Sequence, residues 1–214
     1  MDINYNPYPL SYQPEIINFF IEQNNIEKVI LIGNSAGGTV AIQAALDYPE
    51  KIDGLILISP AVYGGGGAPK WIKPLLNLPQ MDRLGPVLVR TIRERGLELL
   101  KMAWANPENI QPQDLENYQK PLSVDGWDVA LWEFTKVNGD NNLESRLSEI
   151  QIPVVVISGA QDKIIPPDQS VKLNSELLKS EIFILPNCGH VPQEECPIEL
   201  MEIIDDYLLK MEKQ

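Results

Sequence analysis

The chain has 214 residues, 44% hydrophobic and 22% charged, a composition typical of a soluble globular protein of one domain. Its formal net charge of -13 would repel phosphate backbones and anionic lipids, so we expect neither a nucleic acid nor a membrane as a partner. One histidine, His190, and two cysteines argue against a metal site, and we predict no bound metal.

The cysteines and the N-terminal residues indicate a location. Cys188 and Cys196 lack the spacing of a disulfide framework, so we expect them to be small packing residues in a reducing compartment. The sequence has no unbroken apolar stretch of about 18 residues, so we predict no membrane span. Residues 1–10 lack the basic and then apolar pattern of a secretion signal. These features predict a cytoplasmic protein.

Helices and strands are predicted to alternate at both ends of the chain. The predicted elements are a helix at 15–26, a strand at 28–33, a helix at 38–50, a strand at 54–60, a strand at 152–159, a helix at 167–180, a strand at 181–186 and a helix at 198–211. The strands are apolar without alternation, as in a sheet covered on both faces. Short connections between such units predict an α/β fold, with a mostly parallel sheet and helices on both of its faces.

Two of these helices carry apolar residues at helical spacing, which predicts a stripe that faces the core. In the first helix the stripe is Ile16, Ile17, Phe20 and Ile21. In the last helix it is Leu200, Ile203, Ile204, Tyr207, Leu208 and Met211.

The middle of the chain differs from its two ends. Pro, Gly and Asn interrupt helical runs near 81–95, 96–106, 112–120 and 127–137, and all four tryptophans lie in this part. We predict a helical cap at 61–149 over an α/β core formed by 1–60 and 150–214. Trp71, Trp104 and Trp132 of this cap are predicted to contact a substrate, although packing is the commoner role of any single tryptophan.

The segment Gly33-Asn34-Ser35-Ala36-Gly37 has the pattern G-x-S-x-G between a predicted buried strand and a predicted helix. Phosphate-binding patterns do not fit, because no lysine follows the glycines and a serine stands where a dinucleotide fingerprint needs glycine. A sharp turn would expose the Ser35 hydroxyl, with glycines where strand and helix crowd together. We therefore predict Ser35 as a nucleophile, the Ala36 N–H as an oxyanion donor and Asn34 as a substrate contact.

A serine nucleophile needs a base and an acid that orients the base. His190 is the only histidine and follows a predicted strand, at the sheet edge where α/β proteins gather their chemistry. Asp162 follows another predicted strand and is our candidate for the acid. Of the alternatives, Asp168 is better explained as a helix N-cap, and Asp140 lies in the cap. The chain order is then Ser35, Asp162, His190.

This order, and the motifs GNSAGG, SGAQDKIIP and NCGHVPQEECP, resemble the α/β-hydrolase fold family, in its branch with a helical cap. The resemblance covers nearly the whole chain and implies that the four predicted strands correspond to the fifth through eighth strands of the family's sheet. It also implies an oxyanion loop and further strands ahead of Met1. We therefore expect a missing N-terminal segment or a partner chain to complete the sheet.

The predicted function is that of a serine esterase in the carboxylic ester hydrolase class, without a cofactor. A small-molecule ester or a similarly activated acyl compound would react through an acyl-enzyme. Serine as the nucleophile argues against the dehalogenase and epoxide-hydrolase relatives, whereas carbon-carbon bond hydrolases and perhydrolases use the same triad and stay open. A truncated, non-catalytic binding module also stays open: the incomplete sheet favours it and the intact triad argues against it.

Overall fold

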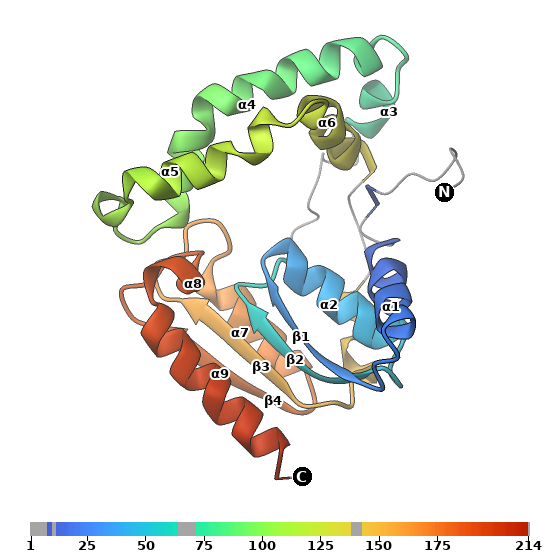
Figure 1. Cartoon of the computed structure of the whole chain (residues 1–214), viewed down its shortest axis with the longest axis vertical. Helices are drawn as coiled ribbons and strands as arrows, with labels where there is room; N and C mark the ends of the chain where they lie inside the picture. The colour runs from blue at the N-terminus through green and yellow to red at the C-terminus, as the bar shows by residue number, and fades with distance from the viewer. Residues whose placement is uncertain (1–7, 10–11, 64–71, 138–142, 214) are drawn as a thin grey trace.

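The computed structural model describes residues 8–9, 12–63, 72–137 and 143–213. Four strands form one parallel sheet in the order β1-β2-β3-β4 (Figure 1). They are β1 (Val29–Asn34), β2 (Ile52–Ile58), β3 (Val154–Gly159) and β4 (Ser180–Leu185). The predicted α/β fold with a parallel sheet is confirmed. Because every strand runs in the same direction, all four carboxyl ends lie at one edge of the sheet.

Helices cover both faces of this sheet, as predicted (Figure 1). On one face lie α1 (Gln13–Gln23), α2 (Ala36–Asp47) and α7 (Pro167–Glu176), and on the other lies α9 (Pro197–Met211). Successive side chains of a strand point to opposite faces. In β2, Leu55 and Leu57 therefore join the core under α2 and α7, and Ile56 and Ile58 join the core under α9.

The two predicted apolar stripes have different outcomes. The stripe of α9 is confirmed, since all six of its residues belong to the core on that face or pack against it. The stripe of α1 is only partly right. Ile21 is buried and Ile17 packs against the core, but Ile16 is 45% and Phe20 60% exposed.

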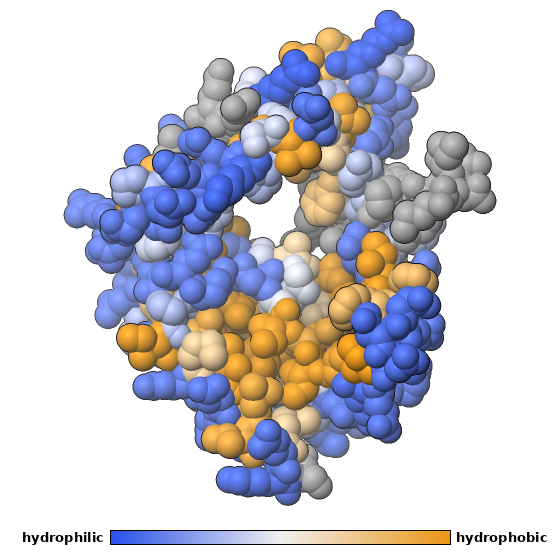
Figure 2. Space-filling view, in the orientation of Figure 1, coloured by the Kyte–Doolittle hydropathy of each residue, from blue (hydrophilic) through white to orange (hydrophobic). Residues whose placement is uncertain are grey.

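Strand β1 lies at an edge of the sheet in the described part of the chain. Ile32 of this strand is 55% exposed, and Figure 2 shows hydrophobic residues over this side of the molecule. Exposed apolar side chains on an edge strand, which is paired on one side only, are unusual on the surface of a complete domain. They favour the prediction that further strands complete the sheet, which stays a prediction.

Above the carboxyl edge lie the helices from α3 to α6, which we call the cap (Figure 1). They are α3 (Lys73–Leu76), α4 (Met81–Ala103), η2 (Pro107–Asn109), α5 (Pro112–Gln119), η3 (Pro121–Ser123) and α6 (Trp127–Val137). The last helix before β3, η4 (Glu144–Glu149), lies instead against the end of α2, where Arg146 pairs with Asp47. The predicted domain bounds, 61–149, stay a prediction, because 64–71 and 138–142 lie outside the described residues. Within the described residues, no helix is long and apolar enough to cross a membrane.

The structure corrects three helix predictions, besides shifts of up to four residues at helix ends. The runs at 81–95 and 96–106 form the single helix α4, which continues through Pro86. Asp168 is not an N-cap: Pro166 holds that position and Asp168 lies in the first turn of α7. The short helix α8 (Pro192–Glu195), between β4 and α9, was not predicted. Its proline at the first position suits a helix start, but four residues are too few to show a periodic pattern.

The interpretation of the two cysteines as separate packing residues was wrong. Cys188 and Cys196 form a disulfide, with their Cα atoms 6.2 Å apart. Both are buried, and the turn through α8 brings them together although eight positions separate them in sequence. The cysteines therefore no longer support a reducing compartment, and the cytoplasmic location stays a prediction.

Candidate active site

Ser35 is the single residue between β1 and α2, and its backbone is strained. Its φ of 53° lies in the left-handed region, which residues with a Cβ rarely adopt. The Ser35 N–H donates to the Ile58 carbonyl at 2.9 Å, and the Ser35 carbonyl accepts from the Ala61 N–H at 3.1 Å. The end of β2 thus holds the turn that presents the serine. Ala36 begins α2, so its N–H is among the first-turn groups that lack a partner within the helix.

The glycines around Ser35 differ in what they do. A Cβ on Gly33 would overlap the Gly37 carbonyl and lie 2.7 Å from the Gly38 nitrogen, and one on Gly38 would lie 2.8 Å from the Cβ of Pro60. A Cβ on Gly37 would meet nothing within 4 Å. The expectation that both outer glycines of the motif relieve crowding is therefore right for Gly33 and wrong for Gly37.

We expect Gly33→Ala to lower the free energy of unfolding by about 1–3 kcal/mol, because the new methyl group meets rigid backbone. Gly37→Ala, in the first turn of α2, is the matched control and should leave stability unchanged or raise it by up to about 1 kcal/mol. Urea denaturation of both variants measures the difference. Equal losses in the two variants would contradict the crowding at Gly33.

Asp162 and His190 meet at the carboxyl edge of the sheet. Asp162 follows β3 and His190 follows β4, and His190 Nδ1 lies 2.8 Å from Asp162 Oδ2. Both residues are buried. The other carboxylate oxygen of Asp162 accepts the N–H groups of Ile164 and Ile165, each at 2.8 Å. A carboxylate fixed by two backbone donors can hold the imidazole in one orientation.

Burial alone would raise the pKa of the Asp162 carboxyl. Hydrogen bonds from His190 and from the Ile165 N–H outweigh burial and hold the pKa below its ordinary value of 3.8. Asp162 is therefore a carboxylate across the neutral range. It would favour the tautomer in which Nδ1 carries the proton and Nε2 is free to act as a base.

This lowered pKa predicts a pH dependence of stability. The unfolded chain binds the Asp162 proton at higher pH than the folded protein, so the carboxylate contributes its full stabilisation above the unfolded pKa and loses it as the pH falls through the folded pKa. Below about pH 4, the unfolding free energy of the wild type should therefore fall more steeply than that of Asp162→Asn. Denaturation curves at a series of pH values test this, and parallel profiles would contradict it.

Asn34 links the turn at Ser35 to the His190 loop. Its side-chain amide donates to the Ile58 carbonyl and to the His190 carbonyl, each at 3.1 Å. The residue before Ser35 thus contacts the backbone of His190. The turn that carries Ser35, the third predicted member of the triad, therefore lies beside the Asp162-His190 pair. A substrate contact by Asn34 stays a prediction, because the structure shows its amide hydrogens bound to backbone.

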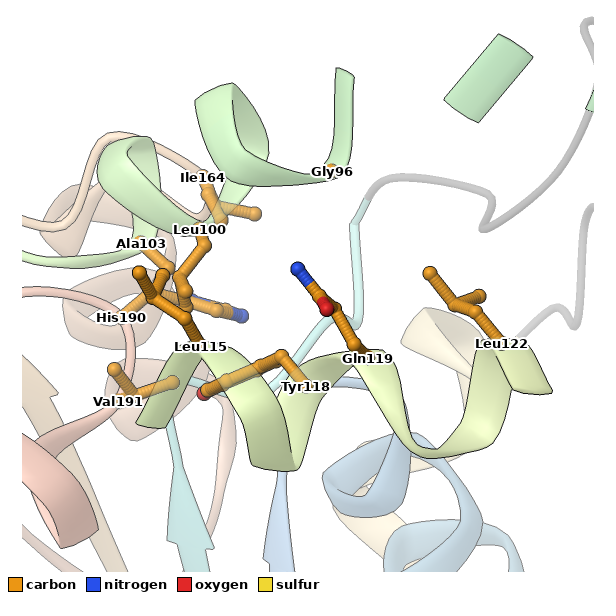
Figure 3. A pocket seen from close by; sticks show the side chains of 10 residues that line it. All are labelled: Gly96, Leu100, Ala103, Leu115, Tyr118, Gln119, Leu122, Ile164, His190 and Val191. Carbon is orange, nitrogen blue, oxygen red and sulfur yellow. The ribbon is translucent and has the colours of Figure 1, made fainter. Parts of the chain in front are cut away.

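A cavity of about 320 Å³ opens beside His190 (Figure 3). Its apolar lining comes from Leu100, Ala103, Leu115, Leu122, Ile164 and Val191. Gly96, Tyr118, Gln119 and His190 complete the lining, and Figure 3 shows the imidazole pointing into the cavity. This size and lining suit a small, largely apolar ligand. Figure 2 shows an opening between the cap and the core of the molecule.

Of the tryptophans predicted to contact substrate, Trp104 and Trp132 are not among the described residues that line this cavity. Trp104 is 4% exposed and packs with Leu100 and Val191, next to the His190 loop. Trp132 is 4% exposed within the cap, where its ring occupies the space that a Cβ on Gly85 would need. Packing is the role that the structure shows for both, and substrate binding by them stays a prediction. Trp71 and Asp140 lie outside the described residues.

The residues that line the cavity were missed by the sequence analysis, apart from His190. Leu115, Tyr118 and Gln119 of α5 have no distinctive pattern, and only their position in a helix-rich insertion between two strands pointed to a cap. Among the described residues, no group of three or more His, Cys, Asp or Glu could hold a metal ion. The site thus joins a strained serine turn, a buried Asp-His pair and an apolar cavity.

The sequence profile of the α/β hydrolase fold family matches residues 2–197. The chain belongs to this family. Among curated relatives, this α/β hydrolase is 32% identical over 180 residues to a 2-hydroxy-6-oxononadienedioate/2-hydroxy-6-oxononatrienedioate hydrolase of Comamonas testosteroni. It is 33% identical over 187 residues to a 2-hydroxy-6-oxo-6-phenylhexa-2,4-dienoate hydrolase of Burkholderia cepacia. Each alignment covers 79% of this chain and 59% of the relative.

Solved structures show the same fold. An esterase from Thermogutta terrifontis matches with a TM-score of 0.72 at 21% identity, covering 95% of this α/β hydrolase and 73% of the esterase. The 2-hydroxy-6-oxo-6-phenylhexa-2,4-dienoate hydrolase of Rhodococcus sp. strain RHA1 matches with a TM-score of 0.70 at 24% identity, covering 100% of this chain and 75% of that one. The chain thus spans about three fifths of the length of the two curated relatives above.

Proposed function

We propose that this α/β hydrolase cleaves a small 6-oxo-dienoate at the carbon-carbon bond next to its keto group, with Ser35, His190 and Asp162 as the triad. The names of the two curated relatives describe hydrolases of such keto acids. They favour the carbon-carbon alternative over the ester substrate expected first. The observation that carries the triad is the buried hydrogen bond between Asp162 and His190, joined to the Ser35 turn through Asn34.

In this reaction Nε2 of His190 takes the proton of Ser35 as its oxygen forms a bond to the keto carbon. The Ala36 N–H donates to the oxygen that becomes negative. For this bond to break, the 2-hydroxy-dienoate reacts as its 2-oxo tautomer, in which the hydroxyl proton has moved to C5. The electron pair of the breaking carbon-carbon bond then passes through the adjacent double bond to the 2-oxo oxygen, and this enolate receives the proton from His190. Water, activated by the same imidazole, releases the acyl group as a carboxylic acid and frees Ser35.

Ester hydrolysis is the second candidate, and the cavity favours it. None of the ten described residues that line the cavity is a lysine, arginine, aspartate or glutamate. An apolar lining without a cation suits an uncharged acyl group. The same triad would attack an ester carbonyl, with an alcohol leaving in place of a carbanion.

The two candidates are separated by assaying this chain with 2-hydroxy-6-oxo-6-phenylhexa-2,4-dienoate and with p-nitrophenyl butyrate. The first substrate would give benzoate and 2-hydroxypenta-2,4-dienoate, with loss of the absorbance of its conjugated system. We expect a higher kcat/KM for the keto acid, and activity on both substrates that depends on Ser35. A clear preference for the ester would favour the esterase, and no Ser35-dependent turnover of either would favour a binding module.

A further inference from the structure

Glu195 of α8 joins the His190 loop to the cap. Its Oε2 accepts the N–H of Gly189 at 2.7 Å and the N–H of Ala105 at 3.0 Å. Its Oε1 accepts the N–H of Asn106 at 2.8 Å. Gly189 directly precedes His190, and the other two donors lie two and three residues after the end of α4. One carboxylate therefore binds both sides of the junction.

The two backbone segments also touch directly at this junction. The His190 N–H donates to the Ala103 carbonyl at 2.6 Å. A Cβ on Gly189 would overlap the Ala103 carbonyl and lie 2.6 Å from the Ala105 nitrogen. Ala103 and His190 both line the cavity. A shift between the His190 loop and the end of α4 would therefore move the imidazole relative to the cavity wall.

A carboxylate suits this junction because three N–H donors converge on it. Hydrogen bonds to a charged acceptor are shorter and stronger than those between neutral groups. Two oxygens provide enough lone pairs for all three donors, whereas an amide provides one oxygen and adds donors of its own. Glu195 is half-buried, so water replaces these contacts only in part.

We infer that Glu195 is a positioning residue, which holds the His190 loop against the end of α4 and so sets where the imidazole lies. Its neighbours support this role. The Cys188–Cys196 disulfide encloses the segment that carries both His190 and Glu195. The inference rests on the proposed function, because position matters only if the imidazole reacts.

The test compares Glu195→Gln with Glu199→Gln, an exposed glutamate in the first turn of α9, as the matched control. The glutamine at 195 replaces one acceptor oxygen with an NH2 group that faces backbone donors. We expect kcat to fall about 10- to 100-fold with KM changed by less than about threefold, since small displacements of reacting groups cost rate more than binding. The control should keep the wild-type kcat.

The single histidine provides a readout that does not depend on turnover. Its imidazole ¹H and ¹⁵N signals in NMR spectra belong to His190 without further assignment. We expect these signals to shift in Glu195→Gln and to stay in place in Glu199→Gln. If the wild type turns over neither substrate, the proposed function fails, while this comparison still decides whether Glu195 positions the imidazole.

Wild-type kcat and wild-type imidazole signals in Glu195→Gln would overturn the inference. Lower activity with unchanged imidazole signals would overturn it too, because the loss would then arise elsewhere. If Glu195→Gln does not fold, Glu195→Asp takes its place. The aspartate keeps both oxygens but draws them back by one methylene, so the signals should shift in the same way, and unchanged signals would contradict the inference.

Discussion

Ser35→Ala should lower kcat at least about 10⁴-fold, because the imidazole would then have no hydroxyl to activate. The alanine keeps the Cβ and the backbone of the turn, so the free energy of unfolding should change by less than about 1 kcal/mol. Steady-state kinetics with the keto acid and the ester, and urea denaturation, measure the two effects.

Ser175→Ala is the matched control for this loss. Ser175 is exposed on α7, and its hydroxyl donates to the Lys172 carbonyl at 2.6 Å, so the variant should keep full activity. If Ser35→Ala retained the wild-type kcat on both substrates, the serine would have no part in the reaction. If Ser35→Ala lost activity because it no longer folded, the urea denaturation curves would show this.

Asp162→Asn should lower kcat about 10³- to 10⁴-fold, the second largest effect that we expect. The asparagine amide can donate to Nδ1 of His190, which would leave the proton on Nε2 and remove the lone pair that takes the Ser35 proton. The NMR signals of the single histidine report which ring nitrogen carries the proton. The measurement is kcat together with the ¹⁵N shifts of the two ring nitrogens.

Asp168→Asn, an exposed aspartate in the first turn of α7, is the control for this charge removal and should keep the wild-type kcat and shifts. An Asp162→Asn variant with a wild-type rate would show that another group orients the imidazole. Unchanged ring-nitrogen shifts with a large loss of rate would assign the loss to something other than the tautomer.

The parts of the site that follow strands could be predicted from the sequence. Ser35, Asp162 and His190 come after β1, β3 and β4, and a parallel sheet brings such positions to one edge whatever their separation in the chain. The prediction of Ser35 as a nucleophile also depended on the segments on both sides of it, because the strained turn requires a strand before it and a helix after it. Local pattern and topology were sufficient for these residues.

The contacts between the cap and the core could not be predicted in this way. Glu195 binds Ala105 and Asn106, some ninety positions earlier, and no periodicity in either segment records that pairing. The disulfide depends on the turn at α8, which is too short to show a pattern. The cavity wall from α5 depends on how the cap sits over the sheet, and only three-dimensional packing determines that.

The tryptophans show what composition alone does not decide. Large aromatic side chains in an insertion suggested substrate contacts, but Trp104 and Trp132 are buried among apolar neighbours. Their size makes them effective at holding a small helical layer together. The described lining of the cavity consists instead of smaller aliphatic residues with Tyr118, Gln119 and His190.

Covalent labelling reports most directly on whether Ser35 is an activated nucleophile. In the reaction with a fluorophosphonate, the Ser35 oxygen bonds to phosphorus, fluoride leaves and His190 takes the proton. Peptide mass spectrometry should find the adduct on Ser35, formed much more slowly in Asp162→Asn. An adduct on another residue, or the same labelling rate in Asp162→Asn, would contradict a serine activated by the Asp162-His190 pair.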